Sequence, residues 1–307
     1  MKKDLLKLLD LTSKDIINIL DLADQLKYEQ KKGVTHKRNL KGKTLGMIFQ
    51  KSSTRTRVSF EVGILQLGGH ALFLSPRDIQ LGRGESIEDT ARVLSRYVDG
   101  IMIRTYDQQE VETLAEYASI PIINGLTDFA HPCQVLADLM TIREYKNKLA
   151  GLKMCFIGDG ANNMSNSLIV GALKTGMDIS IACPKGVEPA PEIMEFAKTV
   201  KGATLTVTDD VLEACKDADV LYTDVWASMG QEEEAAERQK LFAGYQINDK
   251  TLSVAKEDCL VFHCLPAHKG EEITAEAFDA HADEIFDEAE NRLHVQKAIM
   301  VLLMEKR

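Results

Sequence analysis

The fold is decided by a stretch whose order of elements occurs in both halves of the chain. Residues 40–74 read LKGKTLGMIFQKSSTRTRVSFEVGILQLGGHALFL: a polar turn, a β-rich run, a polar loop, an amphipathic helix, a glycine turn and a second β-rich run. Residues 149–182, LAGLKMCFIGDGANNMSNSLIVGALKTGMDISIA, repeat that order. Strand–helix–strand units form parallel sheets with right-handed crossovers. The sequence therefore predicts two similar α/β units.

The same alternation extends outward from these stretches along the chain. Short runs rich in β-branched residues are separated by runs in which apolar residues have helical spacing. Leu5, Leu8 and Leu9 indicate a helix near the N-terminus, and Thr12 or Ser13 is expected to cap the next one. We expect strands at Thr44–Phe49, His70–Leu74, Gly100–Arg104, Ile122–Asn124, Lys153–Ile157, Asp178–Ala182, Thr204–Val207, Val220–Thr223 and Leu260–His263.

The two units predict two domains, each a parallel sheet flanked by helices. A chain of 307 residues is long for one core and short for three. We expect a first domain over residues 1–133 and a second over 134–288, with a linking helix from Gln134 to about Lys148. The last helix, expected from about Glu288 to Met304, has a broad apolar face, so residues 289–307 are predicted to pack on the first domain. Ligands bind beyond the carboxyl ends of parallel strands, which places the expected active site in the cleft between the domains.

The composition excludes several classes of protein. A formal net charge of −10 disfavours a non-specific nucleic-acid binder, because that function needs a basic surface. The six cysteines form no CxxC pair, which indicates free thiols in a reducing compartment. The N-terminus lacks the apolar core of a signal peptide, and no apolar run is long enough to span a membrane. We therefore expect a cytoplasmic protein that binds neither nucleic acid nor membrane.

Residues 52–57, SSTRTR, form the most informative polar cluster. They follow the first predicted strand and enter a helix. A helix N-terminus offers unpaired N–H groups and a positive dipole end, to which this run adds hydroxyls and two guanidiniums. A helix cap beside surface arginines is the alternative, but so many donors in one turn favour a site for a tetrahedral oxyanion. The run lacks GxxxxGK[ST], so nothing points to a nucleoside triphosphate.

Other polar positions end strands or begin helices, and each keeps a structural alternative. Arg104 ends a strand and could bind an anion or pair with a carboxylate. His131 and Gln134 are three residues apart at the start of the linking helix, so they share a face. Asp224 could pair with a substrate ammonium or cap a helix. Arg292, on the last helix, could contact a phosphate or lie on the surface.

Two further runs invite cofactor interpretations that their spacing disfavours. Residues 158–163, GDGANN, lack the third glycine of a dinucleotide fingerprint, and one of the asparagines could instead donate to a ligand carboxylate. Residues 262–268, FHCLPAH, contain a thiol and imidazoles but not the usual spacing of tetrahedral zinc ligands. We expect no cofactor and no metal.

Together and in this order, the motifs resemble the aspartate/ornithine carbamoyltransferase family over essentially the whole chain. Ser53–Arg57 matches its carbamoyl-phosphate signature, and His131–Gln134 matches its carbamoyl-contacting motif. Asp224 with Ser228–Gly230, followed by His263–Pro266, looks like the ornithine branch, since the aspartate branch lacks the Ser-Met-Gly loop. Cys133, within the second motif, and Ala161, before the two asparagines, are small departures from the family pattern.

The resemblance implies roles for matched positions. It assigns carbamoyl-phosphate binding to Ser53, Thr54, Arg55, Thr56, Gln80, Arg104, His131, Gln134, Cys264, Leu265 and Arg292. It assigns ornithine binding to Asn163, Asp224, Ser228 and Met229. The groups expected to act in catalysis are Arg55, Arg104, His131, Gln134, Asp224 and Cys264.

The activity implied by the resemblance is transfer of the carbamoyl group of carbamoyl phosphate to the side-chain amine of L-ornithine. The products would be L-citrulline and phosphate, in arginine biosynthesis. Gln80 matches a residue that family members lend to a neighbouring subunit, which implies a homotrimer, with higher assemblies left open. Three alternatives also stay open: a carbamoyltransferase for another amine such as putrescine, a binding protein that has lost activity, and a dinucleotide-dependent oxidoreductase.

Overall fold

A computed structural model describes residues 3–34, 39–75, 77, 79–80, 84–227 and 234–305, and the chain in it forms two compact units. Unit 1 comprises Met1–Met140 with Asn291–Arg307, and unit 2 comprises Thr141–Glu290. The chain passes from unit 1 to unit 2 within α5 (Pro132–Lys146) and returns within α12 (Ala282–Met304). The domain boundary expected from the sequence, between 133 and 134, falls at the start of α5.

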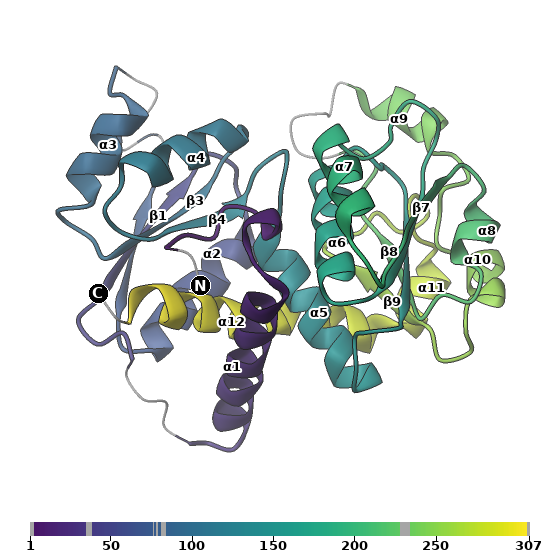
Figure 1. The fold of residues 1–307 in the computed structure, drawn as a ribbon, viewed down its shortest axis with the longest axis horizontal. Helices are drawn as coiled ribbons and strands as arrows, with labels where there is room; N and C mark the ends of the chain where they lie inside the picture. Colours follow the sequence, from purple (N-terminus) through teal and green to yellow (C-terminus); the bar gives the residue numbers. More distant parts are fainter. Residues whose placement is uncertain are drawn as a thin grey trace. The chain divides into compact units, whose positions relative to one another are not determined.

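Unit 1 is built on a four-stranded parallel sheet of order β2-β1-β3-β4 (Figure 1). The helices α3 and α4 pack on one face of this sheet through an apolar cluster that includes Ile48, Ile101 and Leu114. The elements are η1 (Leu8–Asp10, a 3-10 turn), α1 (Ser13–Lys31), β1 (Thr44–Phe49), α2 (Thr54–Gln66), β2 (His70–Leu74), α3 (Ile87–Leu94), β3 (Gly100–Arg104), α4 (Gln108–Tyr117) and β4 (Ile122–Leu126).

Unit 2 is built on a five-stranded parallel sheet of order β7-β6-β5-β8-β9. Figure 1 labels β7, β8 and β9 of this sheet. One face is covered through an apolar cluster that includes Cys215 of α8, Leu221 of β8 and Phe278 of α11. The elements are β5 (Lys153–Ile157), α6 (Asn163–Lys174), β6 (Asp178–Ala182), α7 (Pro191–Thr199), β7 (Leu205–Thr208), α8 (Val211–Cys215), β8 (Val220–Thr223), α9 (Ala235–Leu241), α10 (Asp249–Val254), β9 (Leu260–His263) and α11 (Ala275–Ala280).

Local sequence explains where these elements begin and turn. Thr12 caps α1 with a reciprocal capping box: its hydroxyl accepts from the Asp15 N–H, and the Asp15 carboxylate accepts from the Thr12 N–H. The turn into β2 needs a glycine, because a Cβ on Gly69 would lie 2.8 Å from the Lys43 carbonyl oxygen. Both features lie directly before the element that follows, and they set the residue at which that helix or strand begins.

The two α/β units and their parallel sheets confirm the predicted fold class. The strand predictions hold except that β4 extends to Leu126 and β7 runs from Leu205 to Thr208, one residue later than expected. The linking helix starts earlier, at Pro132, and the last helix starts at Ala282. None of the helices in the described ranges combines the length and apolar character that a bilayer crossing requires.

The expected helix around Leu5–Leu9 is wrong. Leu5 forms a parallel bridge with Ile123 at the edge of the sheet, and only the short turn η1 follows it. Leu5 donates its N–H to the Ile122 carbonyl and accepts from the Asn124 N–H, so its backbone is paired outside any helix. Leu5 and Leu8 are buried all the same, which explains why their spacing resembles one face of a helix.

Candidate active site

The SSTRTR run begins α2, as expected for an anion site. Ser53 is the N-cap, and its hydroxyl accepts from the Thr56 N–H at 3.2 Å. Thr54 is exposed, Arg55 is partly buried, and Thr56 is fully buried. The first turn of a helix presents backbone N–H groups without intrahelical partners, at the positive end of the helix dipole. The start of α2 can therefore receive a phosphate-like anion.

Arg104 lies beside this turn because β1 and β3 are neighbours. Phe49 pairs with Arg104 in the sheet, and the Gln50 N–H donates to the Arg104 carbonyl at 2.8 Å. Only 6 % of the Arg104 side chain is exposed. The parallel register thus brings a second guanidinium to the edge of the sheet from which the SSTRTR run leaves.

Arg292 reaches the same place from the far end of the chain. Its Nη2 donates to the Thr56 hydroxyl at 2.8 Å, and only 3 % of the residue is exposed. The alternative that Arg292 is a surface residue is therefore wrong. Lys27 of α1 fixes the same turn of α12, because its Nζ donates to Oδ1 of Asn291 at 2.8 Å.

His131 lies just before α5, is 5 % exposed, and is surrounded by positive charge. Burial, and then the guanidiniums of Arg292, Arg104 and Arg55, hold the pKa of its imidazole well below the usual value. The ring is therefore neutral at physiological pH. A neutral imidazole can donate one hydrogen bond to a carbonyl oxygen without adding to the local positive charge.

Gln134 is held by a residue that sequence reasoning missed. Its Nε2 donates to Oδ1 of Asp138 at 2.8 Å, and both side chains are buried in α5. The four-residue spacing on one helix could have identified this pair. Cys133, between the two motif residues, donates its thiol to the Asn124 carbonyl at 3.4 Å. Burial raises the pKa of that thiol to about 12, so Cys133 is no nucleophile.

Lys51 is a second residue that sequence reasoning missed. It directly precedes the SSTRTR run, and only 6 % of it is exposed. Its ammonium forms an ion pair with Asp128 and lies 4.2 Å from the centroid of the Tyr106 ring. A lysine between a buried strand and a polar helix start was the available signal.

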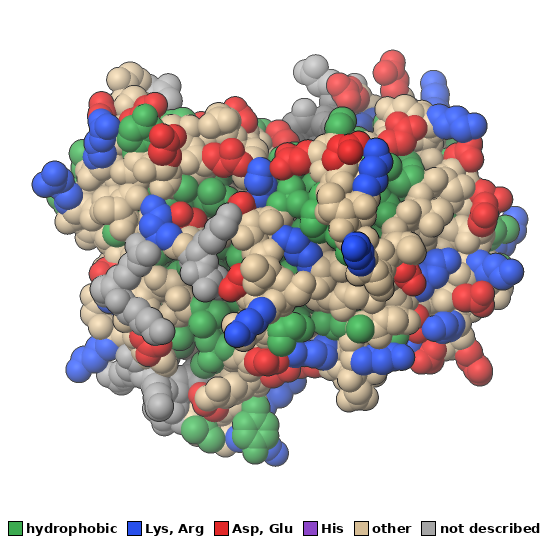
Figure 2. Space-filling model, in the orientation of Figure 1, with side chains coloured by type: hydrophobic (Ala, Val, Ile, Leu, Met, Phe, Trp, Pro, Cys, Tyr) green, Lys and Arg blue, Asp and Glu red, His purple; other side chains and the backbone are tan. Residues whose placement is uncertain are grey.

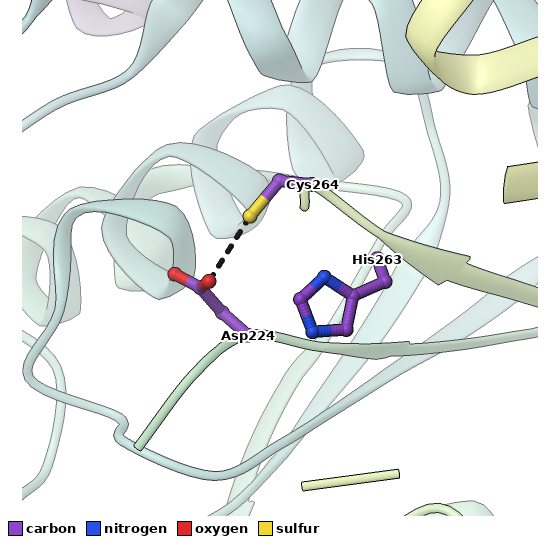
Figure 3. A group of neighbouring side chains, drawn as sticks. All are labelled: Asp224, His263 and Cys264. Atoms are coloured by element: carbon purple, nitrogen blue, oxygen red, sulfur yellow. Dashed lines mark hydrogen bonds between the residues drawn. The ribbon is translucent and has the colours of Figure 1, made fainter. Parts of the chain in front are cut away.

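In unit 2, Asp224 and Cys264 follow two paired strand residues, Thr223 of β8 and His263 of β9. The Cys264 thiol donates to Oδ1 of Asp224 at 3.1 Å, as Figure 3 shows, and the Val225 N–H donates to the same oxygen at 2.8 Å. Burial raises the pKa of the Asp224 carboxyl, although these two hydrogen bonds oppose the shift. The pair places an acidic side chain and a thiol at the carboxyl edge of the sheet.

The two asparagines of GDGANN have different surroundings. Oδ1 of Asn162 caps α6 by accepting from the Ser165 N–H at 2.8 Å, and its Nδ2 lies 3.4 Å from Oδ2 of Asp224. Asn163 is the first residue of α6 and is partly exposed. The capping role occupies Asn162, which leaves Asn163 as the better candidate for a ligand contact.

The rest of the GDGANN turn is engaged by the protein itself. Asp159 forms an ion pair with Arg238, whose guanidinium also donates to the Trp226 carbonyl. A Cβ on Gly160 would lie 2.6 Å from the Val187 carbonyl oxygen, so this glycine is required by packing. These contacts explain Asp159 and Gly160 of the turn without a dinucleotide.

Ligand atoms of Asp224, His263 and Cys264 lie within 4.8 Å of one another, a spacing that a metal ion could bridge. Both nitrogens of His263 are engaged, however: Nδ1 accepts from the Leu265 N–H, and Nε2 pairs with Glu272. The arrangement favours a hydrogen-bonded group over metal ligation.

For three of the predicted site residues, no contact with the rest of the site is described. Ser228 and Met229 lie outside the described residues. Gln80 is exposed and lies beyond β2 in unit 1.

The remaining predicted positions fall into two sets. The first, which we call the anion cluster, consists of Ser53, Thr54, Arg55, Thr56, Arg104, His131, Gln134 and Arg292 in unit 1. The second, the acidic cluster, consists of Asn163, Asp224 and Cys264 with the adjacent Leu265 in unit 2.

Known proteins resemble the chain over its whole length. Sequence profiles of the aspartate/ornithine carbamoyltransferases match it at residues 3–144, for the carbamoyl-P binding domain, and 150–303, for the Asp/Orn binding domain. Ornithine carbamoyltransferase from Syntrophotalea carbinolica is 59 % identical, with 99 % of this chain and 100 % of that protein covered. That from Oceanobacillus iheyensis is 58 % identical, with 98 % and 94 % covered.

Solved structures agree. Ornithine carbamoyltransferase from Pyrococcus furiosus superposes with a TM-score of 0.93 at 52 % identity, covering 98 % of this chain and 96 % of that one. Anabolic ornithine carbamoyltransferase from Campylobacter jejuni gives a TM-score of 0.93 at 45 % identity, with 100 % of both chains covered.

Proposed function

This chain belongs to the aspartate/ornithine carbamoyltransferase family, and we propose that it transfers the carbamoyl group of carbamoyl phosphate to the side-chain amine of L-ornithine. The products are L-citrulline and phosphate. The observation that carries the proposal is the neutral, buried His131 among three guanidiniums, close to the N-terminus of α2. This environment suits a small dianion that also presents a neutral carbonyl.

In the proposed complex, the anion cluster holds carbamoyl phosphate. The N–H groups at the start of α2, the hydroxyls of Ser53, Thr54 and Thr56, and the guanidiniums bind the phosphate. His131 donates to the carbamoyl oxygen, where negative charge grows during attack. One donor of this kind typically contributes about 2.7–4 kcal/mol to stabilisation of the transition state. Gln134, oriented by Asp138, and the Cys264–Leu265 backbone would orient the carbamoyl nitrogen.

The acidic cluster would hold ornithine. We propose that Asp224 binds the α-ammonium group and that Asn163 contacts the amino-acid end together with Ser228 and Met229, while Cys264 lies near the side-chain amine. That amine must react as the neutral base, although its pKa in water is near 10.4, as for lysine. Neighbouring positive charge and removal from water both favour the neutral form.

The reaction balances without a cofactor. The amine nitrogen attacks the carbamoyl carbon and loses one proton. The bond from that carbon to the bridging oxygen breaks, and phosphate leaves with the electron pair and takes up the proton that the amine loses. The positive charge of Arg55, Arg104 and Arg292 stabilises the leaving phosphate.

We also propose that the chain assembles as a homotrimer, with Gln80 of one subunit completing the site of the next. The support is a set of exposed apolar side chains, Val58 and Leu65 on α2 and Leu72 and Phe73 on the edge strand β2. Exposed apolar side chains on and beside an edge strand suit burial against a second copy. A trimer in solution, measured by light scattering, and its dissociation after Leu65→Glu would support this arrangement.

We also propose a role in arginine biosynthesis, in the cytoplasm. The similarity to the anabolic ornithine carbamoyltransferase of Campylobacter jejuni supports the biosynthetic direction. Nucleic acid is no expected partner, since the formal net charge of the chain is −10. On the face that Figure 2 shows, acidic and basic side chains are intermixed.

The function is tested by offering ornithine, putrescine and aspartate in parallel with carbamoyl phosphate. Citrulline from ornithine, with little product from the other two amines, is the expected result. Putrescine has no α-carboxylate or α-ammonium group, so equal use of putrescine would contradict the assignment of Asp224 and Asn163.

A further inference from the structure

A buried histidine and a buried glutamate lie under the loop that carries Cys264 and Leu265. His263, at the end of β9, is 1 % exposed, and Glu272 is fully buried. Nε2 of His263 lies 2.9 Å from Oε1 of Glu272. The Nε2 edge of the ring thus faces Glu272. The opposite edge faces the loop, because Nδ1 lies 2.9 Å from the Leu265 nitrogen.

These contacts fix the protonation state of the ring. A backbone N–H can only donate, so Nδ1 of His263 accepts from Leu265 and carries no proton. The single ring proton is then on Nε2, from which it is donated to the Glu272 carboxylate. His263 is therefore a neutral group with one accepting and one donating edge, like the oriented imidazoles that position groups in other active sites.

Glu272 joins both ends of the loop. The same oxygen that receives the His263 proton also accepts from the His268 N–H at 2.6 Å. The backbone of His263 is fixed from the opposite side by Glu288, which accepts from its N–H at 3.1 Å and from the Tyr222 hydroxyl at 3.1 Å. Leu265 has a φ of +59°, a conformation that a side-chain-bearing residue adopts only when its surroundings hold it.

We propose that His263 and Glu272 are positioning residues for the reaction. They act by holding the Leu265 N–H, and with it the Cys264 thiol and the Leu265 carbonyl, in the geometry that the substrates meet. This inference rests on the proposed function, since the loop matters only if it contacts the substrates. Neither residue touches substrate; each acts through the loop.

Two substitutions of His263 separate its two edges. In His263→Asn, the amide oxygen takes the place of Nδ1 and can still accept from Leu265, but nothing reaches Glu272. In His263→Gln, the amide nitrogen takes the place of Nε2 and can donate to Glu272, but the Leu265 N–H loses its acceptor. Glu284→Gln is the matched control, because Glu284 accepts from the Val261 N–H of the same strand but does not touch the loop.

The expected result is that kcat/KM for ornithine falls roughly 10- to 100-fold further in His263→Gln than in His263→Asn, because a misplaced loop loses its orientation. KM for carbamoyl phosphate should change less than kcat/KM for ornithine in either variant, since the phosphate is bound by the anion cluster and the loop would contact only the carbamoyl end. Glu284→Gln should match the unsubstituted enzyme. A purely structural role for His263 would lower stability in both variants without this difference in ornithine kinetics.

Glu272 provides a second test if the His263 variants fold poorly. Glu272→Gln keeps an oxygen that can accept from His263 and His268, whereas Glu272→Met keeps the size and removes the acceptor. We expect Glu272→Gln to retain most of the activity that Glu272→Met loses. Equal activity in this pair would overturn the role of Glu272.

Hydrogen exchange of the Leu265 amide gives a readout that does not depend on activity. It should be faster in His263→Gln than in His263→Asn or the unsubstituted enzyme. If the two variants show the same exchange and the same kinetics, the positioning role is overturned. If the unsubstituted chain forms no citrulline, the proposed function fails, and the exchange measurement alone still decides whether His263 holds the loop.

Discussion

Nη2 of Arg292 donates a hydrogen bond to the hydroxyl of Thr56 at 2.8 Å, which joins the last helix of the chain to the first turn of α2. Both residues are buried, and both belong to the anion cluster. The contact means that the middle of α12 is part of the proposed phosphate site and that this helix does more than cover unit 1.

Thr56→Val keeps the size of the side chain and removes the oxygen that Arg292 contacts. We expect kcat/KM for carbamoyl phosphate to fall roughly 10- to 100-fold, because a charged donor loses its acceptor and the phosphate loses a hydroxyl. KM for ornithine should stay within about twofold, as judged by initial rates with one substrate saturating. A rise confined to the ornithine KM would show that Thr56 acts elsewhere.

Arg55→Ala should abolish turnover while the fold stays intact. Arg92→Ala is the control: Arg92 lies on α3 of the same unit, is exposed, and contacts Asp89 and the ring of Tyr117. Citrulline formation and urea unfolding of both variants check the prediction. Near-normal turnover of Arg55→Ala, or equal loss in Arg92→Ala, would reject the assignment of Arg55 to the anion site.

The pH dependence of ornithine binding should report on Asp224. Burial raises the pKa of this carboxyl, and only its ionised form pairs well with an ammonium group. As the pH falls through the raised pKa, the carboxyl takes up a proton and KM for ornithine should rise. Asp224→Asn should have a high ornithine KM at neutral pH that no longer depends on acidification. An unchanged pH profile in that variant would mean that another group titrates.

The stability of unit 1 should depend on Lys297, which is fully buried in α12. Burial lowers the pKa of its ammonium from 10.5 to about 8, although Glu29 opposes the shift. Between these values the unfolded chain binds more protons than the folded one, so the free energy of unfolding should rise with pH from about 8 to 10.5. Below pH 8 the cost of burying the charge is fully present.

Lys297→Met should flatten that slope, as measured by urea unfolding at several pH values. Lys297 donates to Gln30 at 2.6 Å and to Gln66 at 3.1 Å, and the variant loses these hydrogen bonds. Its stability at neutral pH therefore reports whether removal of the buried charge outweighs that loss. A slope as steep as in the unsubstituted chain would assign the titration to another group.

The sequence predicted the fold well because the decisive signals are local. The β-rich run before SSTRTR, the glycine turn at Gly69 and the helix between them follow from spacing alone, and the repeat near residue 149 gives the second unit. The failure at Leu5 has a physical reason: its backbone pairs with β4, more than a hundred residues away in the chain. Periodicity cannot distinguish such a bridge from one helical face.

The candidate site shows the same difference between local signals and contacts that form only in the folded chain. Ser53–Arg57 and His131–Gln134 were identified because their residue types suit the chemistry at that spacing. Asp138 and Lys51 were missed although their positions, one helical turn from Gln134 and directly before SSTRTR, offered a signal. Glu272 was missed because its partner His263 is found only in the folded chain, and such a hydrogen bond leaves no motif in the sequence. The Arg292–Thr56 contact likewise depends on tertiary packing that no local pattern encodes.

The central claim is that the anion cluster binds carbamoyl phosphate through the start of α2 and the neutral His131. A crystal structure of the enzyme soaked with carbamoyl phosphate tests it directly. We predict that the phosphate lies at the N-terminus of α2 in contact with Arg55 and Arg104, and that His131 faces the carbamoyl oxygen. A ligand bound elsewhere, or an empty cluster with Arg55 turned toward solvent, would contradict the account.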